Sequence, residues 1–189
     1  MSWDTEATRR KLLEAATIQF ARAGLAGARV DTISREAGVN KERIYQYFGD
    51  KAGLFAAVLA AEVDHLLDGV SVTGSGADAL GHLAGALYDS TAKHPNLPRL
   101  LAWESLELAE PVSADGRAEN CASMVTALDA ALPNHDRAQA AHLLVSVITL
   151  ALADRCLPHL TSLVAPGSDA SNRRAAVIAQ ARALATVEG

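Results

Sequence analysis

Two short amphipathic segments flank a tight turn in residues 30–48, and this spacing restricts the fold more than any other feature of the chain. The first segment has one apolar face and ends at Gly38, a residue for which the positive φ of such a turn costs little. The second, KERIYQYF, places Ile44 and Phe48 four residues apart, so both should face a core. Two short helices joined in this way predict a helix-turn-helix, whose second helix enters the major groove of DNA.

The outer face of this second helix carries side chains suited to reading DNA. Arginine and glutamine form paired hydrogen bonds with guanine and adenine edges, and Arg43 and Gln46 stand there. Lysine and tyrosine reach phosphates and set the register, as expected of Lys41 and Tyr47. From spacing alone, an exposed helix with incidental charges remains an alternative.

Helical patterns continue on both sides of this motif. Leu12, Ala16 and Phe20 recur on one helix face, Gly24 follows where a helix should end, and Asp50 can cap a long helix. The expected fold is all-α. It has a three-helix DNA-binding domain over residues 1–50 and a second helical domain over 51–189, with the connecting helix at 51–68. Beyond a loop at 69–77, helices are expected at about 77–93, 96–109, 115–132, 135–157 and 171–187.

Charge is distributed unevenly along the chain. The net charge is −5, but residues 1–60 hold nine Lys/Arg and seven Asp/Glu, a net of +2, and residues 61–189 a net of −7. Only the first part is therefore expected to meet a polyanion. The N-terminus has no apolar signal segment, no run reaches the roughly 18 apolar residues of a membrane span, and two distant cysteines suit a cytoplasmic protein. No catalytic or metal-binding motif is present, so no enzyme activity, cofactor or metal is expected.

Residues 1–55 resemble the DNA-binding domain of the TetR family of transcriptional regulators. The resemblance rests on the first-helix series that ends at Gly24, followed by the segments ISREAGV, IYQYF and DKAGLF. The family usually has a capping Ser or Thr where Arg29 stands; arginine cannot cap in that way but can reach a phosphate. Glu42 and Arg43 stand where small residues are common, which implies either an unusual operator preference or a pair of charges that contributes little. The predicted DNA contacts are Arg29, Lys41, Glu42, Arg43, Tyr45, Gln46, Tyr47 and Lys51.

The segment AAHLLVSVITLALA, residues 140–153, is apolar almost all round. Such a helix must be buried on all sides, which in a small helical domain usually needs a partner subunit. The alternative is a central helix buried within a monomer. The resemblance implies that residues 51–189 are a helical ligand-binding and dimerisation domain, whose last two helices form a four-helix interface with a second copy. The predicted interface residues are His142, Ser146, Thr149, Leu150 and Ile178.

The segment HPNLPRLLAWESLE resembles a turn and helix of ligand-binding domains in this family. A pocket in a helical domain combines apolar walls with a few polar anchors. Trp103 is the predicted wall and Glu104 the anchor, with Met124 and Leu128 nearby. The alternative is that Trp103 fills the core.

These features predict a repressor that is released from a palindromic operator in double-stranded DNA by a small, mainly apolar effector and that acts as a homodimer. Two alternatives remain open. One is a redox-sensing regulator that uses Cys121 and Cys156; the other is a helical interaction module without DNA binding.

Overall fold

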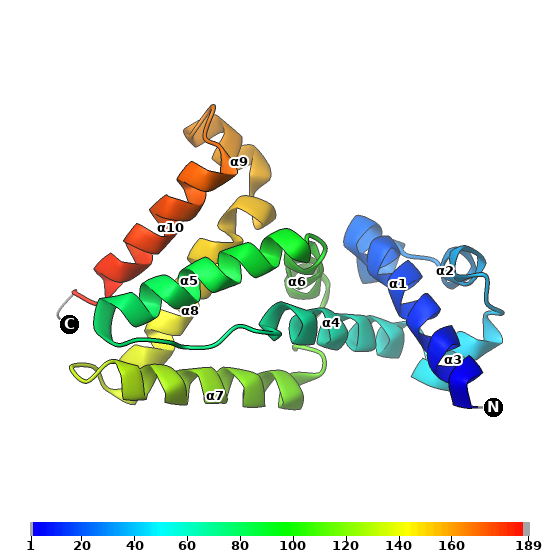
Figure 1. The fold of residues 1–189 in the computed structure, drawn as a ribbon. Coiled ribbons are helices and arrows are strands. Elements are labelled where there is room, and N and C mark those ends of the chain that lie inside the picture. The colour runs from blue at the N-terminus through cyan, green and yellow to red at the C-terminus, as the bar shows by residue number, and fades with distance from the viewer. Residues whose placement is uncertain (1, 187–189) are drawn as a thin grey trace. The chain divides into compact units, whose positions relative to one another are not determined.

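A computed structural model describes residues 2–186, and side chains from residue 5 onward. The described residues form ten helices and no strand, which confirms the predicted all-α fold (Figure 1). Contacts group the chain into two compact units. Unit 1 consists of Met1–Asp64 and Asn96–Asp115, and unit 2 of His65–Pro95 and Gly116–Gly189.

Unit 1 contains more than the predicted three-helix domain. Its helices are α1 (Ser2–Gly27), α2 (Val30–Ala37), α3 (Glu42–Phe48), most of α4 (Lys51–Leu67) and α6 (Leu97–Glu107). Helix α1 packs against both α2 and α6. A division at residue 50 separates α4 and α6 from the motif, whereas the contacts group all five helices together.

The core of unit 1 follows the apolar spacing of the sequence. Leu12, Ala16 and Phe20 on α1 are fully buried, as predicted. The ring of Phe20 meets that of Phe55 on α4 edge to face, with centroids 5.1 Å apart. Ile44 of α3 is also fully buried. The Phe20–Phe55 contact therefore joins α1 to α4 in an apolar core, and α3 also buries an apolar residue.

Helix α1 is broken at Gly24, which has a φ of 69° and a ψ of −177°. The chain then makes one further helical turn, with Ala28 N donating to Gly24 O at 3.2 Å. The predicted end at Gly24 is thus only partly right, because helical structure resumes as far as Gly27. A side chain at Gly24 would be strained by the positive φ, and its Cβ would lie 2.8 Å from Trp103 Cε3.

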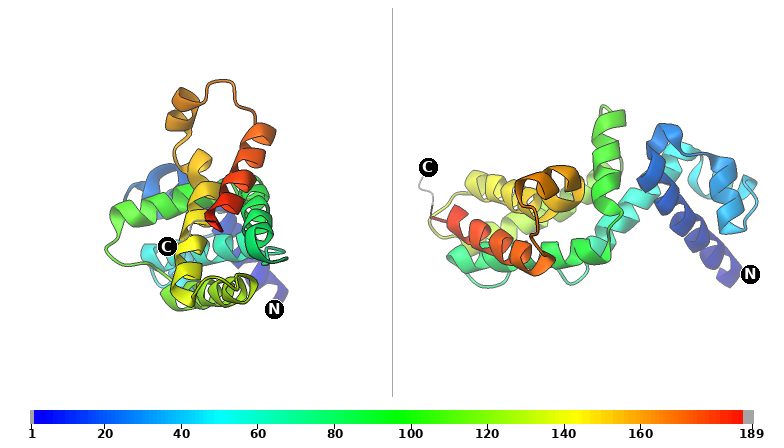
Figure 2. Two further views of the ribbon diagram at one scale, coloured as in Figure 1. Left: turned by 90° about the vertical axis from the view of Figure 1, so that its left-hand side faces the viewer. Right: turned by 90° about the horizontal axis from the view of Figure 1, so that it is seen from above.

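Unit 2 is built around a central helix. Helix α5 (Gly76–Lys93) packs against both α8 (Arg137–Cys156) and α10 (Ala170–Leu184), and α7 (Ala114–Ala131) completes the unit with α9 (Pro158–Val164). Figure 2 shows α9, in orange, between the end of α8 and the start of α10. Helix α9 was not predicted, because the expected helices at 135–157 and 171–187 leave residues 158–170 as a connection. Proline also suits the first turn of a helix, where its missing N–H has no intrahelical partner, and Pro158 begins α9.

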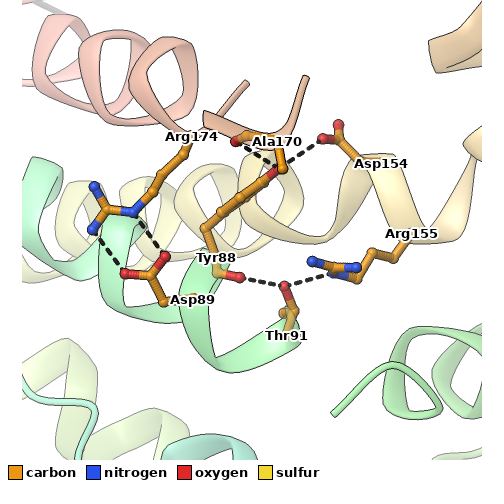
Figure 3. Close-up of polar contacts among 7 residues, drawn as sticks. All are labelled: Tyr88, Asp89, Thr91, Asp154, Arg155, Ala170 and Arg174. Atoms are coloured by element: carbon orange, nitrogen blue, oxygen red, sulfur yellow. Dashed lines mark hydrogen bonds and ion pairs between the residues drawn. The ribbon is translucent and has the colours of Figure 1, made fainter. Parts of the chain in front are cut away.

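Polar contacts join α5 to α8 and α10 (Figure 3). The Tyr88 hydroxyl lies 3.4 Å from both Asp154 Oδ2 and the carbonyl oxygen of Ala170, and burial raises the pKa of this tyrosine. Arg174 donates to both carboxylate oxygens of Asp89 at 2.7 Å, and this hydrogen bonding lowers the pKa of Asp89. The register of α5 against its two neighbours is therefore specified by charged groups as well as by apolar packing.

Only one side of α8 is buried within the chain. Its buried residues are Ala140, Leu144, Val147 and Ala151, whereas Val145 on another face is 63% exposed. Although no uninterrupted apolar run was found in the sequence, the length and composition of α8 suffice for a membrane span. One such helix is weak support for a membrane, because core helices of soluble proteins meet the same criteria.

Candidate nucleic-acid interface

The turn between α2 and α3 has the geometry that its sequence predicts. Gly38 ends α2 in the left-handed region, at φ 65° and ψ 31°, and its N–H donates to carbonyl oxygens at the end of that helix. The following N–H, of Val39, donates to Ser34 O at 3.0 Å. Helix α3 then begins at Glu42, close to the predicted start, and buried Ile44 fixes which of its faces points outward. The result is a helix-turn-helix with a solvated second helix.

The outer face of α3 presents most of the predicted contact residues to solvent. Tyr45 is 50% exposed. Arg43 Nη1 donates to Gln46 Oε1 at 2.9 Å, so the two predicted base-reading side chains lie side by side. The partner of Arg43 is thus Gln46, and not Glu42 as one of the predicted alternatives has it. The exposed predicted contacts on and next to α3 are Lys41, Glu42, Arg43, Tyr45 and Gln46.

Charged residues also lie at the N-termini of both helices of the motif. Lys41 Nζ lies 3.3 Å from Asp31 Oδ1 on α2, and the hydrogen bond to this carboxylate raises the pKa of Lys41. Arg29 occupies the N-cap position of α2, is exposed and forms no side-chain capping hydrogen bond. Arg29 therefore stands at a helix start, where backbone N–H groups are able to bind phosphate oxygens.

Beside the end of α3 lies Arg9 of α1, which was not among the predicted contact residues. Phe48 was expected in the core but is only half-buried, with the Arg9 guanidinium 5.5 Å from its ring centroid. Tyr47, another predicted contact, is half-buried and meets Phe48 edge to face at 6.1 Å. The basic end of α1 therefore lies beside the end of α3. The only signal for Arg9 in the sequence was the run of three basic residues at 9–11.

Lys51 makes contacts inside unit 1. Its Nζ donates to the carbonyl oxygens of Ala26 and Ala28 at 3.2 and 3.1 Å. A cation is favourable there, since carbonyl groups at the end of a helical turn carry partial negative charge. An ammonium has three N–H donors, so these two bonds are compatible with the predicted third, to a phosphate.

The predicted effector residues fall in different units. Trp103 and Glu104 belong to α6 of unit 1, where Trp103 Nε1 donates to Ala21 O at 3.3 Å and the buried Glu104 accepts from Val112 N at 2.8 Å. Met124 and Leu128 belong to α7 of unit 2, and Leu128 is fully buried there. The polar groups of Trp103 and Glu104 thus have partners within unit 1. Their roles as wall and anchor of an effector pocket stay predictions.

The predicted interface residues lie on two helices of unit 2. His142 and Thr149 are exposed on α8, and Ser146 and Leu150 are half-buried there. The hydroxyls of Ser146 and Thr149 donate to carbonyl oxygens one turn earlier in α8, at 3.1 and 2.8 Å. These hydroxyls are therefore satisfied before any partner arrives, so burying them carries little cost. Ile178 of α10 is half-buried against Gly85 of its own chain.

The two cysteines do not form a disulfide. Cys121 on α7 and Cys156 at the end of α8 are both exposed to solvent. Partial burial of the Cys156 thiol raises its pKa, which lowers the fraction of reactive thiolate. This arrangement does not favour the redox-sensing alternative.

A solvated second helix, an internally bonded turn and a separate helical unit define a helix-turn-helix regulator. Residues 12–58 match the family model of bacterial regulatory proteins, tetR family, and residues 79–183 match that of the tetracyclin repressor-like C-terminal domain. The chain belongs to the TetR family of transcriptional regulators. Proteins of this family bind DNA operators and effector ligands, are generally dimeric and typically cytoplasmic, and are generally not enzymes.

Individual relatives agree with this assignment. The chain is 45% identical over 104 residues to the HTH-type transcriptional repressor SCO4008 of Streptomyces coelicolor, covering 55% of this chain and 53% of that protein. It is 35% identical over 107 residues to the HTH-type transcriptional repressor NicS of Pseudomonas putida, covering 52% and 49%. The chain thus spans about half the length of these curated relatives. The crystal structure of the regulator SCO4942 from Streptomyces coelicolor matches with a TM-score of 0.77 and 32% identity, over 94% of this chain and 97% of that one.

Proposed function

We propose that this chain is a transcriptional repressor that binds a palindromic DNA operator as a homodimer. The observation that carries this proposal is the outer face of α3, where Arg43 and Gln46 lie side by side next to an exposed tyrosine. These side chains form paired hydrogen bonds with base edges in the major groove. Arg29, Lys41 and Lys51 are the proposed phosphate contacts, which fix the register of α3.

The experiment that tests this proposal is genome-wide recovery and sequencing of the DNA bound by the protein in its own host. Two-fold symmetry in a dimer implies two half-sites, each read by one copy of α3. The bound fragments should therefore share an inverted repeat, and a purified dimer should bind that repeat more tightly than random DNA. Fragments without a shared sequence would contradict the proposal and favour the helical interaction module.

We further propose that a small, mainly apolar effector binds between the helices of unit 2 and releases the DNA. The half-buried Met124 and the buried Leu128 of α7 are the proposed apolar wall. By thermodynamic linkage, an effector that binds the free protein more tightly than the DNA-bound protein weakens operator binding by the same factor. A tenfold effect requires a difference of about 1.4 kcal/mol in the binding free energy of the effector.

Replacing Arg43 by alanine should weaken binding to the cognate operator by about 1–3 kcal/mol and relax the preference at one base position. The reason is the loss of a paired hydrogen bond to a base edge, with Gln46 losing its partner as well. Binding of the variant to a library of operators with single substitutions measures both effects. An equal loss of affinity for operator and random DNA would show that Arg43 contacts phosphate instead.

Replacing Lys51 by alanine should weaken binding to random DNA, weaken binding to the operator at least as much, and reduce the dependence of affinity on salt. A phosphate contact contributes the same free energy on any sequence and releases about one counterion. The measurement is fluorescence anisotropy at several salt concentrations. An unchanged salt slope would mean that Lys51 contacts no phosphate and bonds only to the carbonyl oxygens of Ala26 and Ala28.

A further inference from the structure

The break in α1 leaves backbone groups that the helix itself no longer satisfies. In a continuous helix, Leu25 N would donate to Ala21 O. Here Ala21 O accepts instead from Arg99 Nε at 2.8 Å and from Trp103 Nε1 at 3.3 Å, both on α6. The carbonyl end of the first part of α1 is therefore capped by two side chains from a distant part of the sequence.

Glu107 caps the other side of the same break. Its Oε2 accepts from Leu25 N at 2.6 Å and from Ala26 N at 3.0 Å. A carboxylate is well placed there, because the first N–H groups of a helical turn carry partial positive charge. Glycine at position 24 permits this approach, since an added Cβ would lie 2.9 Å from the Glu107 carboxyl carbon.

These three side chains form one row on α6. Arg99, Trp103 and Glu107 are spaced four residues apart, which places them along one face of the helix. The two donors lie toward the beginning of the row and the carboxylate lies at its end. The row therefore matches the break, with donors facing the free carbonyl and an acceptor facing the free N–H groups.

The helical turn after the break leads directly into the helix-turn-helix. Its first N–H groups are held by Glu107, and its last carbonyl groups, of Ala26 and Ala28, are held by Lys51 of α4. The turn thus has an anion at its start and a cation at its end, the favourable arrangement for a helix dipole. The next carbonyl, of Arg29, accepts from Ile33 N at 3.1 Å and starts α2. The direction in which α2 leaves α1 therefore depends on how this turn is held.

We infer that Glu107 is a positioning residue for DNA binding, supported by Arg99 and Trp103. It contacts no DNA in this role. It fixes the turn after Gly24 and, through that turn, the orientation of α2 and α3. This inference rests on the proposed DNA-binding function, and it predicts that a change on α6 alters operator affinity through the break in α1.

The test compares three variants of the full-length protein. Glu107→Leu removes the acceptor, Glu107→Gln keeps one acceptor oxygen, and Glu110→Leu removes an exposed carboxylate three residues farther along as the matched control. Fluorescence anisotropy measures binding to an operator recovered from the genome and to random DNA of equal length. We expect Glu107→Leu to weaken operator binding at least tenfold and random DNA binding less. Glu107→Gln should stay within threefold of wild type, and Glu110→Leu should be unchanged.

Hydrogen exchange in the absence of DNA supplies a second measurement. The amides of Leu25 and Ala26 should exchange at least tenfold faster in Glu107→Leu than in wild type, but not in the Glu110 control. If Glu107→Leu does not fold, the milder Trp103→Phe removes one donor to Ala21 O, keeps an aromatic ring and should weaken operator binding severalfold.

Wild-type operator affinity in folded Glu107→Leu, or unchanged exchange at residues 25 and 26, would overturn the inference. Equal losses of affinity for operator and random DNA would also overturn it, because a general loss of folded protein does not change their ratio. Failure of the wild-type protein to bind any recovered fragment would instead contradict the proposed function. In that case, hydrogen exchange alone still decides whether Glu107 holds the turn.

Discussion

Replacing Phe55 by alanine should lower the free energy of unfolding of unit 1 by about 3–5 kcal/mol, the cost typical of removing a buried aromatic ring. Phe55 is fully buried on α4 and meets the fully buried Phe20 of α1 edge to face at 5.1 Å. The substitution leaves a cavity between these two helices and removes an aromatic contact worth about 0.5–1.5 kcal/mol beyond its buried area. Because small domains are stable by only about 5–15 kcal/mol, operator binding should fail at a much lower temperature than in wild type.

Urea unfolding measured by tryptophan fluorescence provides the readout, since Trp3 and Trp103 both belong to unit 1. The matched control is Leu106→Ala, because Leu106 lies on α6 of the same unit but is 76% exposed. The control should change stability by no more than about 0.5 kcal/mol. A loss below about 1 kcal/mol for Phe55→Ala would mean that the unit repacks around the missing ring and that the two phenylalanines do not organise its core.

The helix-turn-helix could be predicted because its signals are local. The apolar spacing, Gly38 at the turn and buried Ile44 all lie within residues 30–48, and the structure has α2, the turn and α3 at the predicted places. Each signal acts over one or two helical turns, so tertiary contacts had little opportunity to override it. The same holds for Asp50, whose Oδ1 accepts from Gly53 N at 2.7 Å at the start of α4, as expected of a cap.

The contacts of α6 could not be predicted in this way. Glu107 bonds to an amide 82 residues earlier in the sequence, and no periodic pattern relates the two positions. Trp103 and Glu104 were assigned to an effector pocket because aromatic and acidic residues in a leucine-rich helix suit one. In the structure their polar groups bond to Ala21 and Val112, and the pocket role stays a prediction. A side chain that bonds to a distant backbone group and one that binds a ligand have the same appearance in the sequence.

The burial of α8 agrees better with its sequence. A helix that is apolar on all sides is expected to be incompletely buried within a single chain. Leu144 and Val147 are buried, while Val145, between them in sequence, is 63% exposed. The exposed hydroxyl of Thr149 donates to the Val145 carbonyl at 2.8 Å, so this hydroxyl keeps a hydrogen-bond partner when water is removed from the face. A second copy of the chain is the partner that family membership suggests, since proteins of this family are generally dimeric.

Replacing Val145 by glutamate should therefore raise the dissociation constant of the dimer at least 100-fold, which corresponds to about 2.7 kcal/mol. A carboxylate without a partner is costly to remove from water, and dimerisation would have to bury it. Val145 suits this test better than the half-buried Leu150, because its side chain is exposed in the single chain and its replacement should leave the protomer folded. Sedimentation velocity over a range of concentrations measures the effect.

Leu106→Glu is the matched control, because Leu106 is an apolar residue on unit 1 that is even more exposed than Val145, and its replacement should leave the dimer intact. Circular dichroism of the Val145→Glu monomer should match that of wild type. Because two half-sites are read by two copies of α3, the monomer should also lose most of its affinity for a palindromic operator while still binding a single half-site weakly. A stable dimer in the Val145 variant would mean that this face of α8 stays in water and that the two copies meet elsewhere on unit 2.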